Sequence, residues 1–353
     1  MTADTIEKLF FDSDYMEGAH PAILKRLAET NLEKTPGYGS DLYTASARDK
    51  IRSACAAPEA EVFFLAGGTQ TNAAVIGALL KPWQGVIAAE TGHISTHEAG
   101  AIEFTGHKVM TLPPVLGKIS AGQIEDALES YAGDDNHDHM VMPGMVYLSQ
   151  PTEYGTLYSL AELEAVSSVC RRFDIPLYID GARLSYALAC PENDVTLADL
   201  ARLCDVFYIG GTKCGALFGE AVVIPRPGLI PHFFTIIKQR GALLAKGRIA
   251  GLQFDTLFTD GLYRKIGENA IRTAGVIKKT LSDNGYPFAI DSPTNQIFIV
   301  LDPAQKKKLT DNVSLSFWEN LPDGRTVMRI ATSWATSEED VKALCALLKD
   351  AAR

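Results

Sequence analysis

The sequence predicts an α/β protein with a mostly parallel sheet between helices, followed by a smaller α+β domain. Between residues 60 and 225, short β-rich runs alternate with helical patterns, which is typical of a parallel sheet covered by helices. After about residue 250 the alternation stops. The length of 353 residues suits one large domain and one smaller domain. We predict that residues 14–250 form the large domain, and that residues 1–13 and 251–353 form the small one.

Seven segments have the composition of strands of one sheet. They are short, rich in β-branched or aromatic residues, and bounded by glycine, proline or polar residues. In chain order they are Glu61–Ala66, Gly85–Ala89, Lys108–Leu112, Met145–Leu148, Leu177–Ile179, Val206–Ile209 and Ala221–Ile224.

Helices are predicted where apolar residues recur at spacings of three and four. Three such segments lie between the strands: Thr69–Leu80, Ala161–Phe173 and Leu197–Leu203. The C-terminal part begins with a predicted long helix, Gly251–Ser282, which is followed by two predicted strands, Gln296–Leu301 and Thr326–Thr332. A final amphipathic helix, Ser337–Ala351, is predicted to begin at the polar residue Ser337.

Composition and charge restrict the function. The apolar content of 46% argues against disorder, and no apolar run reaches the roughly 18 residues of a membrane span. A net charge of −10 argues against nucleic acid or an anionic membrane as the partner. The first residues lack the pattern of a secretory leader, and the six cysteines show no C-x-x-C spacing. We therefore expect reduced thiols, no bound metal and a cytoplasmic location.

The segment FLAGGTQTNAAVIGAL, Phe64–Leu79, places glycines and small hydroxyl residues between a strand and a helix. Free backbone N–H groups and the helix dipole at such a turn bind anions, so phosphate is the expected ligand. A tight turn followed by a helix cap would produce the same pattern, and this alternative stays open for the segment taken alone.

A second polar position follows the apolar strand in PLYIDGARL, Pro176–Leu184. Asp180 emerges at the carboxyl end of that strand, where open α/β sheets bind their ligands. Taken alone, Asp180 also fits a helix cap, and Arg183 fits its salt-bridge partner.

The third position is Lys213, the single charge in the run VFYIGGTKCGALF, Val206–Phe218. An unpaired buried ammonium is costly, and a desolvated lysine has a lowered pKa that makes its amine a nucleophile. A phosphate turn, a carboxylate and such a lysine at the strand ends of one sheet together predict a site for pyridoxal 5'-phosphate. Its small neighbours leave room for a flat ring.

These residues resemble the fold-type-I pyridoxal-phosphate enzymes of the L-threonine aldolase and β-eliminating lyase group. The resemblance covers nearly the whole chain through SDYMEGAHPAIL, GYGSD, AGGTQTN, ETGHISTHEAGA, YIDGARL, GGTKCG and MRIATSWAT, in that order. Within the group, the sequence is most similar to aldolases that act on phenylserine-like β-hydroxy-α-amino acids. The resemblance implies a homodimer or homotetramer with the active site at the subunit interface.

The resemblance also implies the roles of individual residues. Lys213 is the Schiff-base lysine, Asp180 the partner of the pyridine nitrogen, and His93 the residue that stacks on the ring. The remaining cofactor contacts are Gly68, Thr69, Gln70, Arg183, Thr212 and Arg248, with Arg240 as the alternative to Arg248 in a segment that matches the family loosely. The substrate contacts are Ser13, Tyr38, Arg183 and Arg329, with Tyr38 and the Arg240 or Arg248 side chain contributed by a neighbouring subunit.

The chain departs from the family pattern after the mid-sheet strand. The family often has a histidine near the β-hydroxyl of the substrate, whereas the segment LSQPTEYG here has Glu153 at the matching place. A carboxylate can take the hydroxyl proton, so Glu153 is the fourth predicted catalytic residue, and threonine need not be the preferred substrate.

Another local interpretation is a metal site, because His93 and His97 are four residues apart with Glu90 and Glu98 nearby. The order is not H-E-x-x-H and no third ligand cluster accompanies it, so we expect no metal.

The predicted function is retro-aldol cleavage of a β-hydroxy-α-amino acid to glycine and an aldehyde. Another reaction at Cα, β-elimination or transamination, is the nearest alternative, because the pocket selects which bond breaks. A non-catalytic binding protein would be expected to lack the cofactor residues that this sequence retains.

Overall fold

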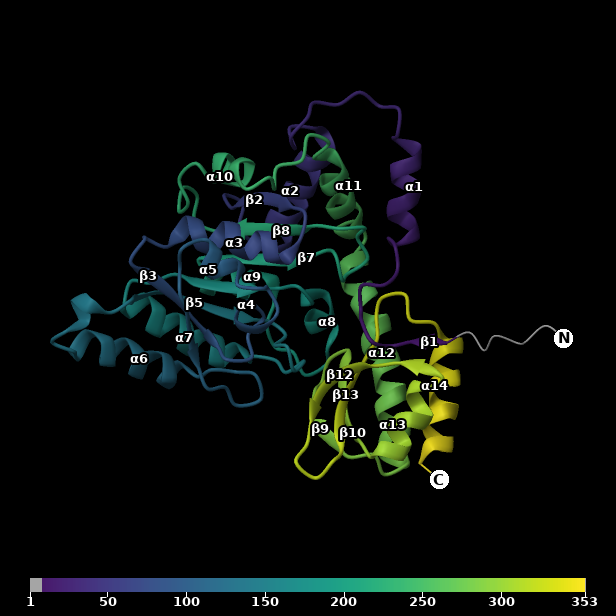
Figure 1. The fold of residues 1–353 in the computed structure, drawn as a ribbon. Helices are drawn as coiled ribbons and strands as arrows, with labels where there is room; N and C mark the ends of the chain where they lie inside the picture. Colours follow the sequence, from purple (N-terminus) through teal and green to yellow (C-terminus); the bar gives the residue numbers. More distant parts are fainter. Residues whose placement is uncertain (1–7, 353) are drawn as a thin grey trace.

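The computed structural model describes residues 8–352, which form a large domain built on a seven-stranded sheet and a smaller C-terminal domain (Figure 1). The large sheet has the order β2 (Glu61–Leu65), β8 (Glu220–Ile224), β7 (Val206–Gly210), β6 (Leu177–Asp180), β5 (Met142–Ser149), β3 (Gln84–Ala89) and β4 (Val109–Leu112). Strand β8 runs antiparallel to both β2 and β7, whereas the other neighbours are parallel. The predicted strands and the mostly parallel sheet are confirmed.

Both faces of this sheet are buried. Successive residues of a strand point to opposite faces, so Val146 and Ile179 belong to one apolar cluster while Tyr147 and Tyr178 belong to the other. The helices that connect or flank the strands are α3 (Gly68–Leu79), α4 (His93–Thr96), α5 (Ala101–Phe104), α6 (Ala121–Gly133), the 3-10 helix η1 (His137–His139), α7 (Leu160–Arg172), α8 (Leu184–Ala189), α9 (Leu197–Leu203) and α10 (Phe233–Gln239).

Three further helices, α1 (Pro21–Glu29), α2 (Leu42–Ala54) and α11 (Arg248–Leu257), meet beside β2 and β8 (Figure 1). The buried Asp255 of α11 holds them together. Its carboxylate accepts hydrogen bonds from Arg26 of α1 at 2.5 Å and from Lys50 of α2 at 2.6 Å. Two cations compensate the buried charge of Asp255, so this carboxylate joins segments that are far apart in the sequence.

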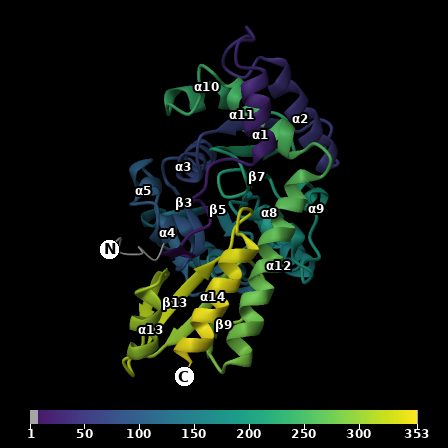
Figure 2. The same cartoon turned by 90° about the vertical axis from the view of Figure 1, so that its right-hand side faces the viewer.

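The small domain contains an antiparallel sheet in the order β12 (Ser316–Asn320), β13 (Thr326–Ala331), β10 (Gln296–Leu301) and β9 (Phe288–Ile290). Its helices are α12 (Leu262–Asp283), α13 (Pro303–Thr310) and α14 (Glu338–Ala351), with α12 and α14 side by side in Figure 2. The N-terminal strand β1 (Leu9–Phe10) pairs with β11 (Val313–Ser314), so Leu9 and Phe10 join this domain.

The predicted long helix Gly251–Ser282 is wrong, because the chain forms two helices, α11 and α12. The break lies at Asp260 and Gly261, whose φ angles of 51° and 69° are left-handed and cannot continue a helix. Phe254 and Ile266 pack in the core of the large domain, whereas Ile277 packs in the small one. Helix α12 therefore packs against the cores of both domains, and the boundary at residue 251 stays a prediction.

Within residues 8–352, none of the helices combines the length and apolar character that a membrane span requires.

Candidate active site

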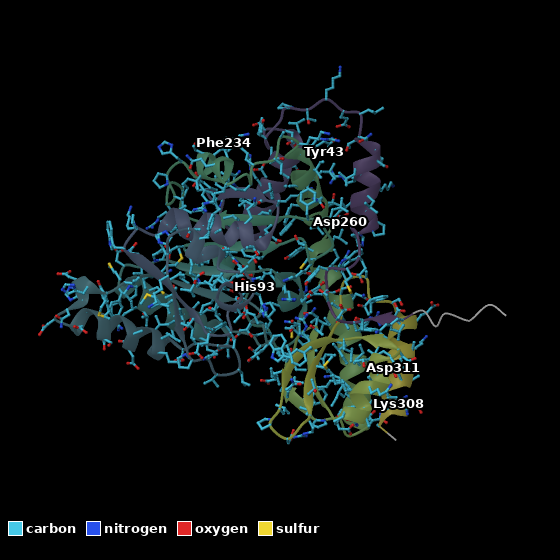
Figure 3. The ribbon with its side chains drawn as sticks, viewed as in Figure 1. Tyr43, His93, Phe234, Asp260, Lys308 and Asp311 are labelled. Carbon is cyan, nitrogen blue, oxygen red and sulfur yellow. The ribbon has the colours of Figure 1, made fainter. Side chains whose placement is uncertain are left out.

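A cavity of about 300 Å³ opens at the carboxyl ends of β5, β6 and β7. It is lined by the turn before α3, by Asp180 and by Lys213. A second hollow of about 450 Å³ shares Lys213 and His93 with it and extends to Arg329 and Trp318 of the small domain. His93 therefore lies where the two hollows meet, and Figure 3 labels it in the large domain. The fold brings the predicted phosphate turn, carboxylate and lysine to one place.

The turn before α3 supplies unoccupied backbone donors. Gly67 is the N-cap of α3, has an extended backbone and makes no side-chain cap, so the first N–H groups of the helix have no partner from a cap. Gly67, Gly68 and Thr69 line the cavity. A Cβ atom at Gly68 would lie 3.2 Å from the Tyr208 hydroxyl, so a side chain there would crowd the cavity wall. These features fit a phosphate group.

The Gln70 side chain is not brought into the cavity. Its amide oxygen accepts a hydrogen bond from the Ala66 N–H at 3.4 Å, and its amide nitrogen donates to the Arg240 carbonyl at 3.5 Å. A role of Gln70 in cofactor binding would therefore use its backbone N–H at the start of α3.

Asp180 is a buried carboxylate with four hydrogen-bond donors. The hydroxyls of Tyr208 and Tyr147 donate to its two oxygens at 2.5 and 2.7 Å. The Ala182 N–H adds a bond of 2.9 Å and the Asn72 amide one of 3.2 Å. Burial alone would raise the pKa of Asp180, but the charge of His93 and the hydrogen bonds from both tyrosines outweigh it, so the pKa is lowered. The carboxylate stays ionised and can hold a proton on a ring nitrogen.

The His93 ring is fixed by a second buried acid. His93 Nδ1 lies 2.8 Å from Glu98 Oε1, and the same oxygen accepts a hydrogen bond from Asn72 at 2.7 Å. Because Asn72 also contacts Asp180, a continuous polar network joins the ring that faces both cavities to the carboxylate beneath. The sequence analysis gave Asn72 no role and named Glu98 only beside a possible metal site, although both lie in quoted segments, AGGTQTN and ETGHISTHEAGA.

Lys213 follows β7 and lines both cavities. Its Nζ lies 5.8 Å from the centre of the Tyr15 ring, and its carbonyl accepts a hydrogen bond from Tyr186 at 2.5 Å. Burial lowers the pKa of the Lys213 amine, and the charge of Arg183 lowers it further. The environment therefore favours the neutral amine that nucleophilic attack requires.

Arg183 lines both cavities and is held by Asp14, which the sequence analysis missed. The Arg183 Nε and Nη2 atoms donate to the two Asp14 oxygens at 2.6 and 3.0 Å. Burial by itself raises the pKa of Asp14, but the Arg183 charge brings it down to about 2. Asn295 adds a hydrogen bond of 3.0 Å to the same carboxylate. The two-pronged ion pair fixes the Arg183 guanidinium in the wall of both cavities.

Arg329 and Ser13 carry donors without partners. Arg329 Nη1 donates to Gln296 at 2.9 Å, and Nη2 donates to the Asp12 carbonyl at 2.9 Å. Among residues 8–352, Arg329 Nε and Ser13 Oγ are buried atoms with no hydrogen-bond partner. Buried donors normally find an acceptor. Arg329 lines the outer hollow and suits a carboxylate supplied by a ligand, whereas Ser13 lines neither cavity.

Glu153 lies beside His93 rather than on an exposed loop. Its carboxylate accepts hydrogen bonds from the Ser149 hydroxyl at 2.7 Å and from the His93 N–H at 2.9 Å. Burial raises the pKa of Glu153, while the Ser149 hydrogen bond offsets part of the rise. Thr212 also lines the main cavity, and its hydroxyl accepts a hydrogen bond from the Gly219 N–H at 3.0 Å.

Tyr38 and Arg248 do not line the cavity of their own chain. Tyr38 is exposed at the edge of a separate small hollow, where the Lys238 ammonium lies 4.3 Å from the centre of its ring. Arg248 donates to the Thr30 carbonyl at 2.9 Å, and its Nη1 atom is buried without a partner in the described part of the chain. Their roles in a neighbouring subunit's site stay predictions.

The alternative metal site gains no support. His93 and His97 have ring centres 5.9 Å apart. The described residues contain no group of three or more histidine, cysteine or acidic side chains that could hold a metal ion.

The fold and the cavity define a fold-type-I enzyme that uses pyridoxal 5'-phosphate. The aspartate aminotransferase of Thermus thermophilus has this fold, with a TM-score of 0.73 and 15% identity over 98% of this chain and 92% of that one. The model of the beta-eliminating lyase family matches residues 11–292, and this chain belongs to that family.

Threonine aldolases are among the similar proteins. The chain is 31% identical to the low specificity L-threonine aldolase of Pseudomonas aeruginosa over 95% of both chains. It is 43% identical to the solved threonine aldolase of Leishmania major, with a TM-score of 0.95, over 98% of this chain and 100% of that one.

Proposed function

We propose that this protein is a pyridoxal-phosphate-dependent aldolase that cleaves L-β-hydroxy-α-amino acids of the threonine or phenylserine type to glycine and an aldehyde. The observation that carries the proposal is the meeting of Lys213, the ionised Asp180 and the open donors before α3 in one cavity. Full-length similarity to threonine aldolases supports the choice of reaction.

Each end of the cofactor has a matching group in the cavity. The phosphate would bind the N–H groups at Gly68 and Thr69, Asp180 would hold the ring nitrogen, and Lys213 would carry the covalent link. Bound there, pyridoxal phosphate supplies the electron sink for the bond that breaks at Cα.

The substrate carboxylate would bind Arg329, which lines the outer hollow and carries a donor without a partner, with Ser13 as the second predicted contact. Holding the carboxylate fixes the rotation about the bond to the amine and therefore selects the Cα bond that breaks. The β-hydroxyl would then lie near Glu153 and His93, which are joined by a hydrogen bond and face both cavities. One of these two groups takes the hydroxyl proton as the aldehyde forms.

An aryl β-substituent has a place to bind. The outer hollow is bordered by the side chains of Phe317 and Trp318, together with His97. Trp318 packs edge-on against Phe298 with ring centres 4.8 Å apart, which fixes its position. An aromatic side chain would bury more apolar surface here than a methyl group, so we propose a preference for phenylserine over threonine.

The test is an assay of products across a panel of amino acids. Purified protein supplied with pyridoxal phosphate is incubated with phenylserine, threonine, serine and alanine, and aldehyde, glycine, ammonia and keto acid are each measured. Aldehyde and glycine in equal amounts support the aldolase. Ammonia with keto acid would instead identify β-elimination, and keto acid without ammonia would identify transamination.

The assembly and the location are also proposals. We propose a homodimer or homotetramer, supported by the exposed Leu32, Leu42, Tyr38 and Phe234 on the large domain; Figure 3 labels Phe234 on α10. Light scattering at several concentrations tests this, and a monomer would exclude a shared site. A cytoplasmic location is supported by the six cysteines, which are all free and buried.

A further inference from the structure

Glu98 is a buried acid behind the His93 ring for which neither the resemblance nor the comparisons give a role. Its side chain has no exposed surface and lines neither hollow, whereas the His93 side chain is 32% exposed and lines both. Glu98 Oε1 lies 2.8 Å from His93 Nδ1 and 2.7 Å from Asn72 Nδ2. Among residues 8–352, Glu98 Oε2 is a buried atom without a hydrogen-bond partner. A buried acid with one unpaired oxygen is costly, so its burial needs a reason other than stability.

The direction of each hydrogen bond in this network can be followed from Asp180 to His93. Asp180 stays ionised, and an ionised carboxylate only accepts hydrogen bonds. The Asn72 group that lies 3.2 Å from Asp180 Oδ2 must therefore be its NH2 group. This orientation agrees with the Tyr178 hydroxyl, which donates to Asn72 Oδ1 at 2.7 Å. The NH2 group has two hydrogens, so it donates the second one to Glu98 Oε1.

These directions leave His93 Nδ1 as the donor to Glu98. Oε1 already accepts from Asn72, and without a hydrogen between Oε1 and Nδ1 two lone pairs would face each other at 2.8 Å. One hydrogen must therefore lie between the two atoms. Imidazole is a stronger base than a carboxylate, so this hydrogen belongs to Nδ1. In the neutral ring the other nitrogen, Nε2, is then the acceptor.

We propose that Glu98 is a positioning residue that fixes the tautomer of His93, so that the neutral ring carries its hydrogen on Nδ1 and presents Nε2 to the hollows as an acceptor. The backbone of His93 is held as well, because its N–H donates to Glu153 at 2.9 Å. Two acids thus hold the backbone and the ring of one histidine. Nε2 is the ring nitrogen that Glu98 leaves to a ligand.

The tautomer decides what the His93 ring can do for a substrate hydroxyl. With Nε2 as acceptor, the neutral ring takes up the hydroxyl proton, whereas a ring with its hydrogen on Nε2 can only donate to the hydroxyl. Glu153 is the other candidate for this proton. The Glu153 oxygen that holds the His93 N–H also accepts from the Ser149 hydroxyl at 2.7 Å, so it is less available than Nε2. The geometry therefore favours His93 Nε2 over that oxygen.

The experiment measures the tautomer directly, in the full-length protein after removal of the cofactor. Protein with nitrogen-15 in its histidine rings is studied by NMR at increasing pH until the ring signals no longer change, so that the rings are neutral. A ring nitrogen with a hydrogen and one without differ in chemical shift, and the signals that disappear in His93→Asn belong to His93. The hydrogen is expected on Nδ1 in the wild type, and a hydrogen on Nε2 would overturn the proposal.

Two variants of nearly equal size separate the acceptor from the packing. Glu98→Gln keeps a carbonyl oxygen for Asn72 and His93 and is expected to keep the hydrogen on Nδ1. Glu98→Met keeps the length but removes the acceptor, so the hydrogen is expected on Nε2 in about half of the molecules or more. Glu103→Gln changes an exposed acid of α5 and is the control that should match the wild type.

The wild-type tautomer in Glu98→Met would overturn the proposal, because the acceptor would then not fix the ring. If Glu98→Met does not fold, the other two spectra still decide. A hydrogen on Nε2 in the wild type would overturn the proposal. The same result in Glu98→Gln would do so as well, because Asn72 would then not direct an acceptor toward His93.

The inference rests on the proposed function for its meaning in turnover, and a second readout links the two. In the cofactor-loaded protein, Glu98→Met is expected to lower kcat for phenylserine by about 10²-fold, because the acceptor at Nε2 is lost, whereas Glu98→Gln is expected to stay within about tenfold of the wild type. Equal kcat values for the two variants would overturn the role in turnover. If the wild type shows no aldolase activity, the proposed function fails, while the NMR spectrum of the cofactor-free protein still tests the tautomer.

Discussion

The end of β6 and the start of β8 each bury one carboxyl group in the wall of the same cavity, and the environments of the two acids differ. Asp180 accepts four hydrogen bonds and has a lowered pKa, whereas Glu220 is bonded by Gly211 and Thr212 and has its pKa raised to about 8. Burial acts on both in the same direction. The number of donors and the nearby charges decide which acid keeps a negative charge, so the wall of one cavity can hold an ionised acid and a neutral acid.

The largest effect is expected from removing the charge at the end of β6. Asp180→Asn keeps the side-chain shape but cannot stabilise a proton on the ring nitrogen, so kcat/KM is expected to fall by about 10³-fold or more. Steady-state aldehyde release measures the loss, and the visible absorbance measures whether the cofactor still binds. Asp174→Asn, an exposed change in the turn before β6, is the control and should match the wild type. Equal activity of Asp180→Asn and wild type would remove the distinction between the two acids.

A smaller effect is expected from making Asp180 resemble Glu220 by removing its donors. The double variant Tyr147→Phe/Tyr208→Phe deletes two hydrogen bonds to Asp180, so the pKa of Asp180 rises. As pH falls, Asp180 then becomes protonated at a higher pH than in the wild type. The acid limb of the kcat/KM profile is expected to move to higher pH, with activity at neutral pH falling about tenfold.

Tyr178→Phe is the matched control for that pair. Tyr178 is buried in the same layer of the sheet, but its hydroxyl donates to Asn72 at 2.7 Å instead of to Asp180. It loses a comparable aromatic hydroxyl while leaving both tyrosine donors of Asp180 in place. An acid limb that moves equally in Tyr178→Phe would mean that general loosening of the core, and not the donors, causes the shift.

The raised pKa of Glu220 also predicts how stability depends on pH. The folded pKa of about 8 lies above the ordinary value of 4.5, so the protonated acid contributes stability that is complete below 4.5 and is lost as pH rises through about 8. Between about pH 5 and about pH 8, the fall in Tm is expected to be smaller in Glu220→Gln than in wild type by about 2 °C or more. Thermal scans at both pH values with Glu61→Gln as control measure it, and identical falls would contradict a raised pKa.

The same contrast explains what the sequence could predict. Asp180 and Lys213 follow β-rich runs, and parallel topology brings such strand ends together, so both were identified from the sequence. Tyr147 and Asn72 were not identified, because each donates a hydrogen bond to Asp180, which is 33 and 108 positions away from them in the sequence. Their own segments have the pattern of ordinary buried core. Glu220 precedes an apolar strand like any solvated turn residue. Its burial follows from antiparallel pairing of β8 with β2 and β7, which periodicity does not specify.

Helices could be predicted from the sequence where their own caps and apolar spacing determine their bounds. The caps and spacing of α7 and α14 specify them without reference to the rest of the chain, and the structure places both within one residue of the predicted bounds. The break between α11 and α12 was missed because Asp260 and Gly261 interrupt a continuous helical pattern, and an aspartate–glycine pair does not by itself require a turn.

The smallest effect is expected far from both carboxyl groups, at the cap of α14. The Ser337 hydroxyl accepts a hydrogen bond from the Asp340 N–H at 3.0 Å and donates to its carboxylate at 2.8 Å. Ser337→Ala removes both, which is expected to reduce the free energy of unfolding by about 1 kcal/mol. Urea unfolding followed by circular dichroism measures the change, and kcat/KM should stay at the wild-type value because the cavity is untouched.

Ser282→Ala supplies the comparison for this cap. Ser282 is an exposed serine near the end of α12, where alanine is the better helix former, so its replacement is expected to be neutral or slightly stabilising. If Ser337→Ala behaves in the same way, the cap does not stabilise the small domain. If Ser337→Ala instead lowers activity as well as stability, then the packing of α14 affects the position of Arg329 through the sheet. The part of the cavity that the small domain forms would then depend on the helix layer more than the separate apolar clusters indicate.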